Sequence, residues 1–291
     1  MKIHQIHPIK KILVPVDFSK DSRKALNYAV GLATKMDSRV VLFHAVHLPL
    51  ISQRELIAVT SLAEIEQEAV AQLWAWQHAI KVETGFENLE TASGTGLLVD
   101  QIAAYASDEK FDLVVMATHG AGGLSGILLG SNTSEIIEKC GCPVIAVPIV
   151  SDFHAIKKVL FATNYADNDF QSIYLLTQYF RDFGPEIVVA HVELSDEHTV
   201  EVELMDWFKK QVQGSIPYSN ITFQLLKGES VEVALNSHCA NESYDLIAVS
   251  MRRRNFFDRL TSRSLTKKLV NHSEVPVLAF HAMQVSGTPL F

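Results

Sequence analysis

The stretch from Asp112 to Pro148 limits the folds open to this chain, because two apolar runs enclose a glycine-rich segment. The runs are Leu113–Ala117 and Val144–Val147. Between them lie Gly120, Gly122, Gly123, Gly126, Gly130 and a helix start at Ser131-Asn132-Thr133. The order strand, glycine-rich loop, helix and strand presents backbone N–H groups to a phosphate. The stretch therefore predicts an anion site, although such loops also serve as plain turns.

Composition and charge exclude several classes of protein. A chain of 291 residues, 48% hydrophobic and 20% charged, has the size of about two globular domains and is not disordered. A net charge of −8 argues against general nucleic-acid binding. Three cysteines form no disulfide framework, and neither a leader segment nor a bilayer-length apolar run is seen. We expect a soluble cytoplasmic protein.

Strand and helix patterns alternate along the first half of the chain. Strands are expected at residues 12–16, 39–46, 88–93, 113–117 and 144–147, and helices at 22–36, 53–82, 97–106 and from 131 onward. This alternation predicts a doubly wound parallel sheet, with its ligand at the carboxyl ends of the strands where the winding reverses. Asp17 follows the first strand and Gly120 the fourth, so both face one crevice if those strands are neighbours.

The pattern occurs twice. Three segments of the first half recur in the second: Lys10–Asp17 as Lys157–Asn164, Asp112–Ala117 as Asp245–Ser250, and Cys142–Ala146 as Val275–Ala279. The second copy is shorter by about 14 residues, in the region of its long second helix. A repeat of this size indicates duplication of a domain. We expect domains at residues 1–150 and 151–291, joined by a short linker around 149–155.

With both copies in view, the chain resembles a tandem universal stress protein over residues 9–150 and 154–281. The resemblance rests on VPVDFS (Val14–Ser19) and on VVMATHG…LLGSNTSEI (Val114–Ile136). Nucleotide-binding members carry a glycine, two residues, a glycine, nine residues, then Gly-Ser or Gly-Thr. Gly120 and Gly130-Ser131 fit this spacing, whereas Ala117 replaces the first glycine and leaves less room beside a ligand.

The resemblance implies two Rossmann-like α/β domains of the adenine nucleotide alpha hydrolase type, each a five-stranded parallel sheet with helices on both faces. It also implies ATP or AMP, with or without Mg²⁺, in the first copy. The residues carried over for adenine and ribose are Pro15, Val16, Asp17 and Val46. Those carried over for the ribose and phosphate path are Met116, Ala117, His119 and Gly120, and those for the phosphates are Gly130, Ser131, Asn132 and Thr133.

The second copy departs from the motif. Ser250, Arg253 and Arg263 stand at its three glycine positions, and Asn164 replaces Asp17. Arginine side chains would fill space that the backbone needs for close approach to a phosphate. We therefore predict that the second copy does not bind ATP in the family manner.

Three functions stay open. The first is a nucleotide-binding regulatory protein of the stress response, favoured because no catalytic base or metal cluster is visible near the loop. The second is an enzyme, through slow ATP hydrolysis or adenylyl chemistry. The third is an interaction module that binds no nucleotide and contacts an acidic partner through the basic stretch Arg252–Lys268, which otherwise reads as a solvated face.

Family members with one domain form dimers through their last strand. The resemblance therefore implies that Cys142–Val147 and Val275–Phe280 meet as a pseudo-twofold pair within one chain. A homodimer of the whole chain is compatible with its remaining helix faces. No membrane or nucleic-acid partner is expected, and the protein partner is unknown. A metal site at Cys140 and Cys142 is disfavoured because their spacing is too narrow.

Overall fold

The computed structural model describes residues 8–46, 62–118, 131–194, 198–251 and 273–281. It separates into two compact units, His7–His154 and Ala155–Phe291. Several predicted features lie outside the described residues: His119, Gly120, Gly130 and the basic stretch Arg252–Lys268. The described helices include none that is both long enough and apolar enough to cross a bilayer.

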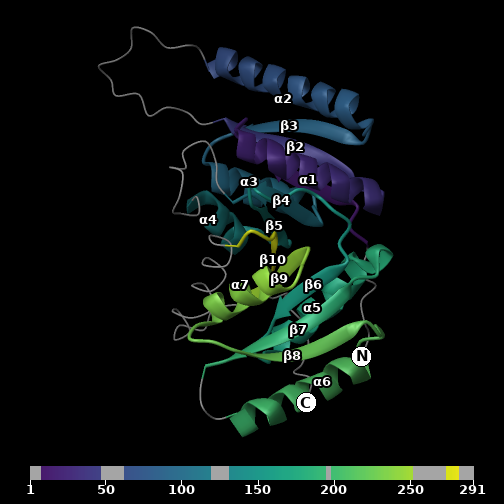
Figure 1. The fold of residues 1–291 in the computed structure, drawn as a ribbon. Coiled ribbons are helices and arrows are strands. Elements are labelled where there is room, and N and C mark those ends of the chain that lie inside the picture. Colours follow the sequence, from purple (N-terminus) through teal and green to yellow (C-terminus); the bar gives the residue numbers. More distant parts are fainter. Residues whose placement is uncertain (1–7, 47–61, 119–130, 195–197, 252–272, 282–291) are drawn as a thin grey trace, which may run out of the picture. The chain divides into compact units, whose positions relative to one another are not determined.

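The first unit alternates strands and helices throughout (Figure 1). In chain order its elements are β1 Lys11–Pro15, α1 Lys20–Met36, β2 Arg39–Val46, α2 Leu62–Thr84, β3 Leu89–Thr95, α3 Leu98–Asp108, β4 Leu113–Ala117, α4 Ser131–Lys139 and β5 Val144–Val147. The strands are all parallel, in the order β3-β2-β1-β4-β5. The predicted doubly wound sheet is confirmed.

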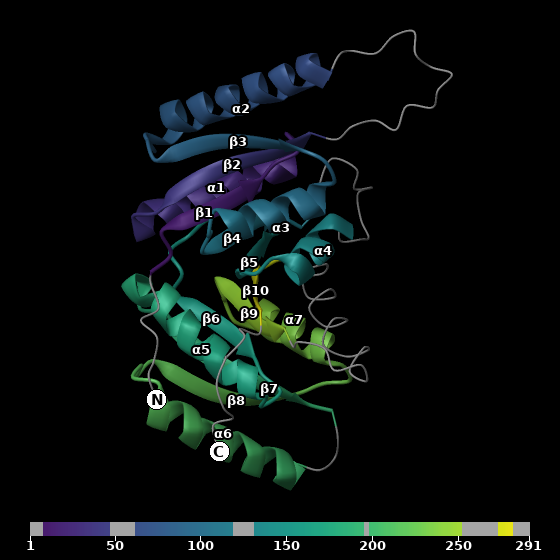
Figure 2. The same cartoon turned by 180° about the vertical axis from the view of Figure 1, so that it is seen from behind.

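Burial explains the strand sequences. Every residue of β1, β4 and β5 is buried, as expected for apolar runs covered by helices on both faces. In the first unit, α1 lies in front of the sheet in Figure 1, whereas α3 and α4 lie in front of it in Figure 2. The buried face of α1 includes Ala25, Tyr28, Ala29 and Leu32.

The third strand differs from its prediction at one end. Gly94 and Gly96 predict a turn, but β3 continues to Thr95 and α3 begins only at Leu98. The cause is the sheet, because Gly94 and Thr95 still pair with Ala45 and Val46 of β2. The strand is at the edge of the first unit's sheet, as its polar sequence predicts.

The second unit repeats the plan. Its elements are β6 Lys158–Ala162, α5 Asp167–Tyr179, the short 3₁₀ helix η1 Arg181–Phe183, β7 Glu186–Glu193, α6 His198–Ser215, β8 Ile221–Lys227, α7 Val231–Asn241, β9 Leu246–Met251 and β10 Val277–His281. These parallel strands follow the order β10-β9-β6-β7-β8. α6 has 18 residues where α2 has 23, so part of the missing length falls in the predicted helix.

One contact shows the duplication in atomic detail. Asp112 Oδ2 accepts hydrogen bonds from the backbone N–H groups of Lys10 and Lys11, at 2.8 and 2.9 Å. Asp245 Oδ2 accepts from the equivalent groups just before and at the start of β6, at 2.7 and 2.9 Å. Each carboxylate thus fastens the start of the central strand to its neighbour.

Candidate functional site

The candidate site lies where the winding of the first sheet reverses. From β1 the chain winds outward through β2 to β3, and the remaining strands β4 and β5 lie on the other side of β1. β1 and β4 are direct parallel neighbours. Their final residues, Pro15 and Ala117, therefore lie at the same edge of the sheet, together with Val46 at the end of β2. This arrangement satisfies the condition that the sequence left open for a shared crevice.

Asp17 follows β1 at this edge, and its side chain is exposed. Its Oδ1 accepts hydrogen bonds from the backbone N–H of Ser19 at 3.1 Å and from the Ser19 hydroxyl at 2.5 Å. The same hydroxyl oxygen accepts from the N–H of Ser22 at 3.1 Å and caps α1. Ser19 thus caps the helix and also holds the Asp17 carboxylate.

The end of β4 is joined to the start of α4. Met116 and Ala117 are each only 7% exposed. Thr133 is buried, and its hydroxyl donates a hydrogen bond of 3.1 Å to the carbonyl oxygen of Ala117. The Thr133 hydroxyl therefore already donates its proton within the protein, and this bond ties the start of α4 to the end of β4.

The start of α4 is suited to an anion. Its first turn contains no acidic residue, so no carboxylate of that turn offsets the positive end of the helix dipole. Asn132 is exposed there, whereas the side chain of Ser131 lies outside the described residues.

Sequence reasoning missed His44, which lies close to Asp17. Its Nδ1 is 2.8 Å from the carbonyl oxygen of Val16, and its ring lies against Phe18 with 4.6 Å between ring centroids. The available signal was the repeat itself, because a histidine recurs at the same place in β7, as His191.

In the second unit, side chains of α5 hydrogen-bond to the end of β9, the strand equivalent to β4. Asn168 of α5 donates from Nδ2 to the Ser250 hydroxyl at 2.7 Å and to the Met251 carbonyl at 3.1 Å, both in β9. The Ser172 hydroxyl, also of α5, donates to that of Ser250 at 3.1 Å. In the first unit, the equivalents of Ser172 and Ser250 are Ala25 and Ala117, whose methyl groups cannot make this bridge.

Donor groups of the loop after β6 form hydrogen bonds with a carboxylate of the same unit. The buried Asp169 accepts three hydrogen bonds through Oδ2, from the Thr163 hydroxyl at 2.8 Å, the Asn164 N–H at 3.0 Å and the Ala166 N–H at 3.2 Å. Ser22 holds the equivalent position in the first unit. The two loops therefore share a path but have different electrostatics.

The cysteines offer little reactivity at neutral pH. Burial raises the pKa of the Cys140 thiol, and likewise that of Cys142, to about 12. Both are therefore protonated near pH 7, and a thiol is a poor metal ligand compared with a thiolate. Among the residues that the structure describes, no three His, Cys, Asp or Glu side chains are grouped to hold a metal ion.

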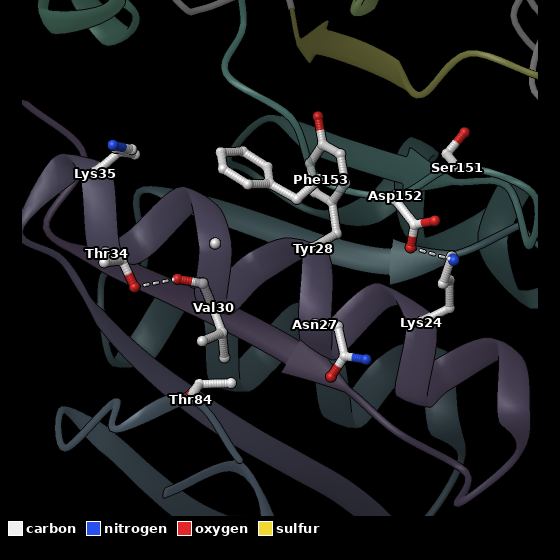
Figure 3. Close-up of a pocket in the computed structure, with 11 residues that line it drawn as sticks. Lys24, Asn27, Tyr28, Val30, Thr34, Lys35, Thr84, Ser151, Asp152 and Phe153 are labelled. Atoms are coloured by element: carbon white, nitrogen blue, oxygen red, sulfur yellow. Dashed lines mark hydrogen bonds and ion pairs between the residues drawn. The ribbon is translucent and has the colours of Figure 1, made fainter.

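A separate groove of about 440 Å³ lies between α1, the end of α2 and the segment Ser151–Phe153 (Figure 3). Lys24 forms an ion pair with Asp152 at one end, and Lys35 lies at the other. The Phe153 ring meets the Tyr28 ring edge-on, 5.3 Å between centroids. None of the predicted site residues lines this groove.

The sequence and the fold were compared with those of known proteins. The model of the universal stress protein family matches residues 8–148 and 181–281, in both units. This chain belongs to the universal stress protein family. Because the family model matches twice, the protein is a tandem member.

Individual relatives agree with this assignment. Universal stress protein MJ0531 of Methanocaldococcus jannaschii is 35% identical over 146 residues, which cover 47% of this chain and 81% of that protein. MJ0577 of the same organism is 30% identical over 153 residues, 47% of this chain and 94% of that one. A crystal structure of a universal stress protein from Archaeoglobus fulgidus has a TM-score of 0.73 at 17% identity, covers 95% of this chain and 100% of its own, and shows the shared fold.

Proposed function

We propose that this universal stress protein is a regulatory protein of the stress response that binds one adenine nucleotide, ATP or AMP. The ligand lies in the first domain, residues 1–150, and the second domain, 151–291, binds none. One observation carries the proposal: the ends of β1, β2 and β4 and the start of α4 converge where the winding of the first sheet reverses.

The nucleoside end is assigned to the first two strands. Asp17 is an exposed carboxylate that can accept hydrogen bonds from ribose hydroxyls or the adenine amine. Val46 is a buried apolar residue at the end of β2, and we assign it to the wall beside the adenine ring. Pro15 and Val16 complete this side, and Met116 and Ala117 supply the wall at the end of β4.

The phosphate end is assigned to the glycine-rich loop and α4. Nine residues separate Gly120 from Gly130, as in the nucleotide-binding pattern of the family, and α4 begins at Ser131. The N-terminus of α4 and the exposed Asn132 amide would receive the phosphates. Thr133 fixes the helix through Ala117, so we assign it a supporting role.

Restriction of the ligand to one domain rests on the contrast between the two crevices. In the second unit the bridge from Asn168 and Ser172 to Ser250 joins α5 to β9 where the first unit has alanines. Arg253 and Arg263 replace two motif glycines in the sequence. The two arginine side chains oppose close approach of a phosphate to the backbone of this loop.

Calorimetric titration of ATP, AMP and GTP, with and without Mg²⁺, tests the proposal. We expect adenine nucleotides to bind with micromolar affinity at one site per chain. Gly130→Arg, which places in the first domain the residue that the second domain has, should abolish binding. Asp17→Ala should weaken binding. The matched control Asn164→Ala changes the equivalent loop of the second domain and should leave affinity unchanged.

The same titration can refute the proposal. Absence of binding in the wild type would overturn it, and two sites per chain would overturn the restriction to the first domain. A parallel assay of phosphate release tests whether the protein hydrolyses ATP as well as binding it. We expect ATP to survive incubation with the protein, because the sequence near the loop offers no evident catalytic base.

A further inference from the structure

We propose that His44 is a positioning residue that clamps the chain on both sides of Asp17 and thereby sets the nucleoside end of the site. The inference rests on the proposed function, because Asp17 is assigned there to ribose and adenine. Its structural part, the clamp itself, can be tested without any nucleotide.

The first arm of the clamp holds the residue before Asp17. The Val16 N–H donates to the Phe43 carbonyl at 2.8 Å and so extends the pairing of β1 with β2 by one residue. The Val16 carbonyl oxygen lies 2.8 Å from His44 Nδ1. Because a carbonyl oxygen can only accept, Nδ1 carries the proton and donates it. Both backbone polar groups of Val16 are therefore fixed.

The second arm holds the residue after Asp17. Phe18 has a left-handed backbone, with φ of 61°, which turns the chain sharply out of β1. Its ring lies on the His44 imidazole, with centroids 4.6 Å apart and planes inclined by 34°. The Trp76 ring of α2 also meets the Phe18 ring, in an edge-on arrangement with 5.5 Å between centroids. The phenyl ring is thus held between β2 and α2.

Asp17 lies between these two fixed residues. His44 donates to the carbonyl before Asp17, and its ring contacts the Phe18 ring after Asp17 at a tilt of 34°, so one side chain contacts both neighbours of Asp17. The hydroxyl and the backbone N–H of Ser19 donate hydrogen bonds to Asp17 Oδ1, at 2.5 and 3.1 Å. The direction of the carboxylate therefore depends on His44 through the backbone.

The second unit contains the same clamp around a different residue. His191 Nδ1 lies 2.9 Å from the Thr163 carbonyl oxygen, and Tyr165 stacks on His191 at 4.3 Å and 24°. Tyr165 also has a left-handed backbone, with φ of 63°. The residue held between them is Asn164. Duplication has kept the clamp while the clamped residue changed, which supplies a matched control within one chain.

The two clamps differ at the second imidazole nitrogen. His191 Nε2 lies 3.2 Å from a carboxylate oxygen of Glu201 in α6, so this histidine is also tied to its helix by an ion pair when protonated. In the second unit, Glu193 ends β7 where Val46 ends β2. The adenine end predicted for the first unit is therefore apolar, and its counterpart is acidic.

A test without ligand measures amide hydrogen exchange by NMR in full-length protein. The Ser19 N–H is bonded to Asp17, so His44→Ala should accelerate its exchange at least several-fold. His191→Ala should leave Ser19 unchanged. Unaltered exchange of Ser19 in His44→Ala would overturn the clamp whether or not the protein binds a nucleotide.

A test with ligand is a double-mutant cycle of His44→Ala and Asp17→Ala, read by AMP titration. A charged hydrogen bond is worth about ten- to a hundredfold in affinity, so we expect each single variant to lose at least about tenfold. If His44 acts through Asp17, the double variant loses no more than Asp17→Ala alone. Affinity for inorganic tripolyphosphate should be the same in wild type and His44→Ala.

The outcomes separate the two proposals. Additive losses, or equal losses for AMP and tripolyphosphate, would overturn the positioning role while leaving nucleotide binding intact. Should thermal unfolding show that His44→Ala does not fold, Phe18→Leu replaces it in both tests, because it removes the second arm alone. Absence of both AMP and ATP binding in wild type refutes the proposed function, and Ser19 exchange then decides the clamp.

Discussion

Two aromatic residues have backbone conformations that favour glycine. Phe18 and Tyr165 are at the same point of the two copies, with φ of 61° and 63°. A left-handed conformation costs a non-glycine residue about 1–2 kcal/mol. Ring contacts with His44 and His191 offset this cost, since an aromatic pair contributes about 0.5–1.5 kcal/mol beyond its buried area. The turn after the first strand of each unit is thus fixed by side chains.

Asp169 provides a prediction at the residue scale. Asp169→Ala would leave three donors of the loop after β6 without their acceptor. We expect a loss of about 2–4 kcal/mol in the free energy of unfolding, measured by urea titration. The control is Asp167→Ala, an exposed aspartate in the same first turn of α5, which should cost less than about 1 kcal/mol. Equal losses would mean that the helix dipole, not the loop, explains Asp169.

A second prediction concerns acid sensitivity. Hydrogen bonds from Lys11 and Lys158 lower the pKa values of Glu109 and Glu242, which hold equivalent positions. Each carboxylate therefore stabilises the fold above its unfolded pKa near 4.5, and this contribution disappears as the pH falls through the lower folded value.

The double variant Glu109→Gln and Glu242→Gln tests this linkage. Its urea midpoint should be lower than that of wild type at pH 7, and the difference should shrink as the pH falls below 4.5. Urea titrations at pH 7, 5, 4 and 3 measure it. A difference that stays constant over this range would contradict the linkage.

At the scale of elements, α1 carries a notch that receives the segment after β5. A Cβ atom placed on Gly31 would lie 2.3 Å from Cδ1 of Phe153. The glycine in mid-helix thus has a packing reason, because it admits the phenyl ring that also meets Tyr28 (Figure 3). Residues up to Phe153 pack with the first unit.

A mutant cycle tests the notch. Gly31→Ala should destabilise the protein in urea unfolding, because the methyl group displaces Phe153. In the background of Phe153→Ala the same change should stabilise by up to about 1 kcal/mol, since alanine is the better helix former. If Gly31→Ala stabilises both backgrounds equally, Phe153 does not occupy the notch in solution.

At the scale of the whole molecule, the proposal assigns unequal roles to two similar domains. Both have the same strand order, the same fastening of their central strand and the same histidine clamp. They differ near the reversal of winding, where α5 side chains hydrogen-bond to Ser250 and Met251 of β9, whereas the first unit has Ala25 and Ala117 at the positions of Ser172 and Ser250. A ligand should therefore stabilise one unit.

Hydrogen exchange resolved by unit tests this asymmetry. ATP at a hundredfold excess over its Kd should raise the opening free energy of amides in the first unit by about 2.7 kcal/mol. Amides of β6 to β9 should change by less than about 0.5 kcal/mol. Equal protection of both units would contradict a single site in the first domain.

The sequence alone determined the fold class and the bounds of three strands in the first unit. Buried parallel strands read as continuous apolar runs, so β2, β4 and β5 begin and end at their predicted residues. The sequence also revealed the duplication, because the second copy preserves apolar runs of the first. The family assignment followed from the glycine spacing and from VPVDFS, both local in sequence.

Tertiary structure decided what depends on neighbours distant in sequence. β3 runs past Ser93 because β2 continues beside it, and Thr133 bonds to Ala117 because α4 begins beside β4. The clamp of His44 around Asp17 joins residues 28 positions apart, as does that of His191. Propensity and spacing describe one segment at a time, whereas hydrogen bonds and ring contacts between strands exist only once the sheet brings their ends together.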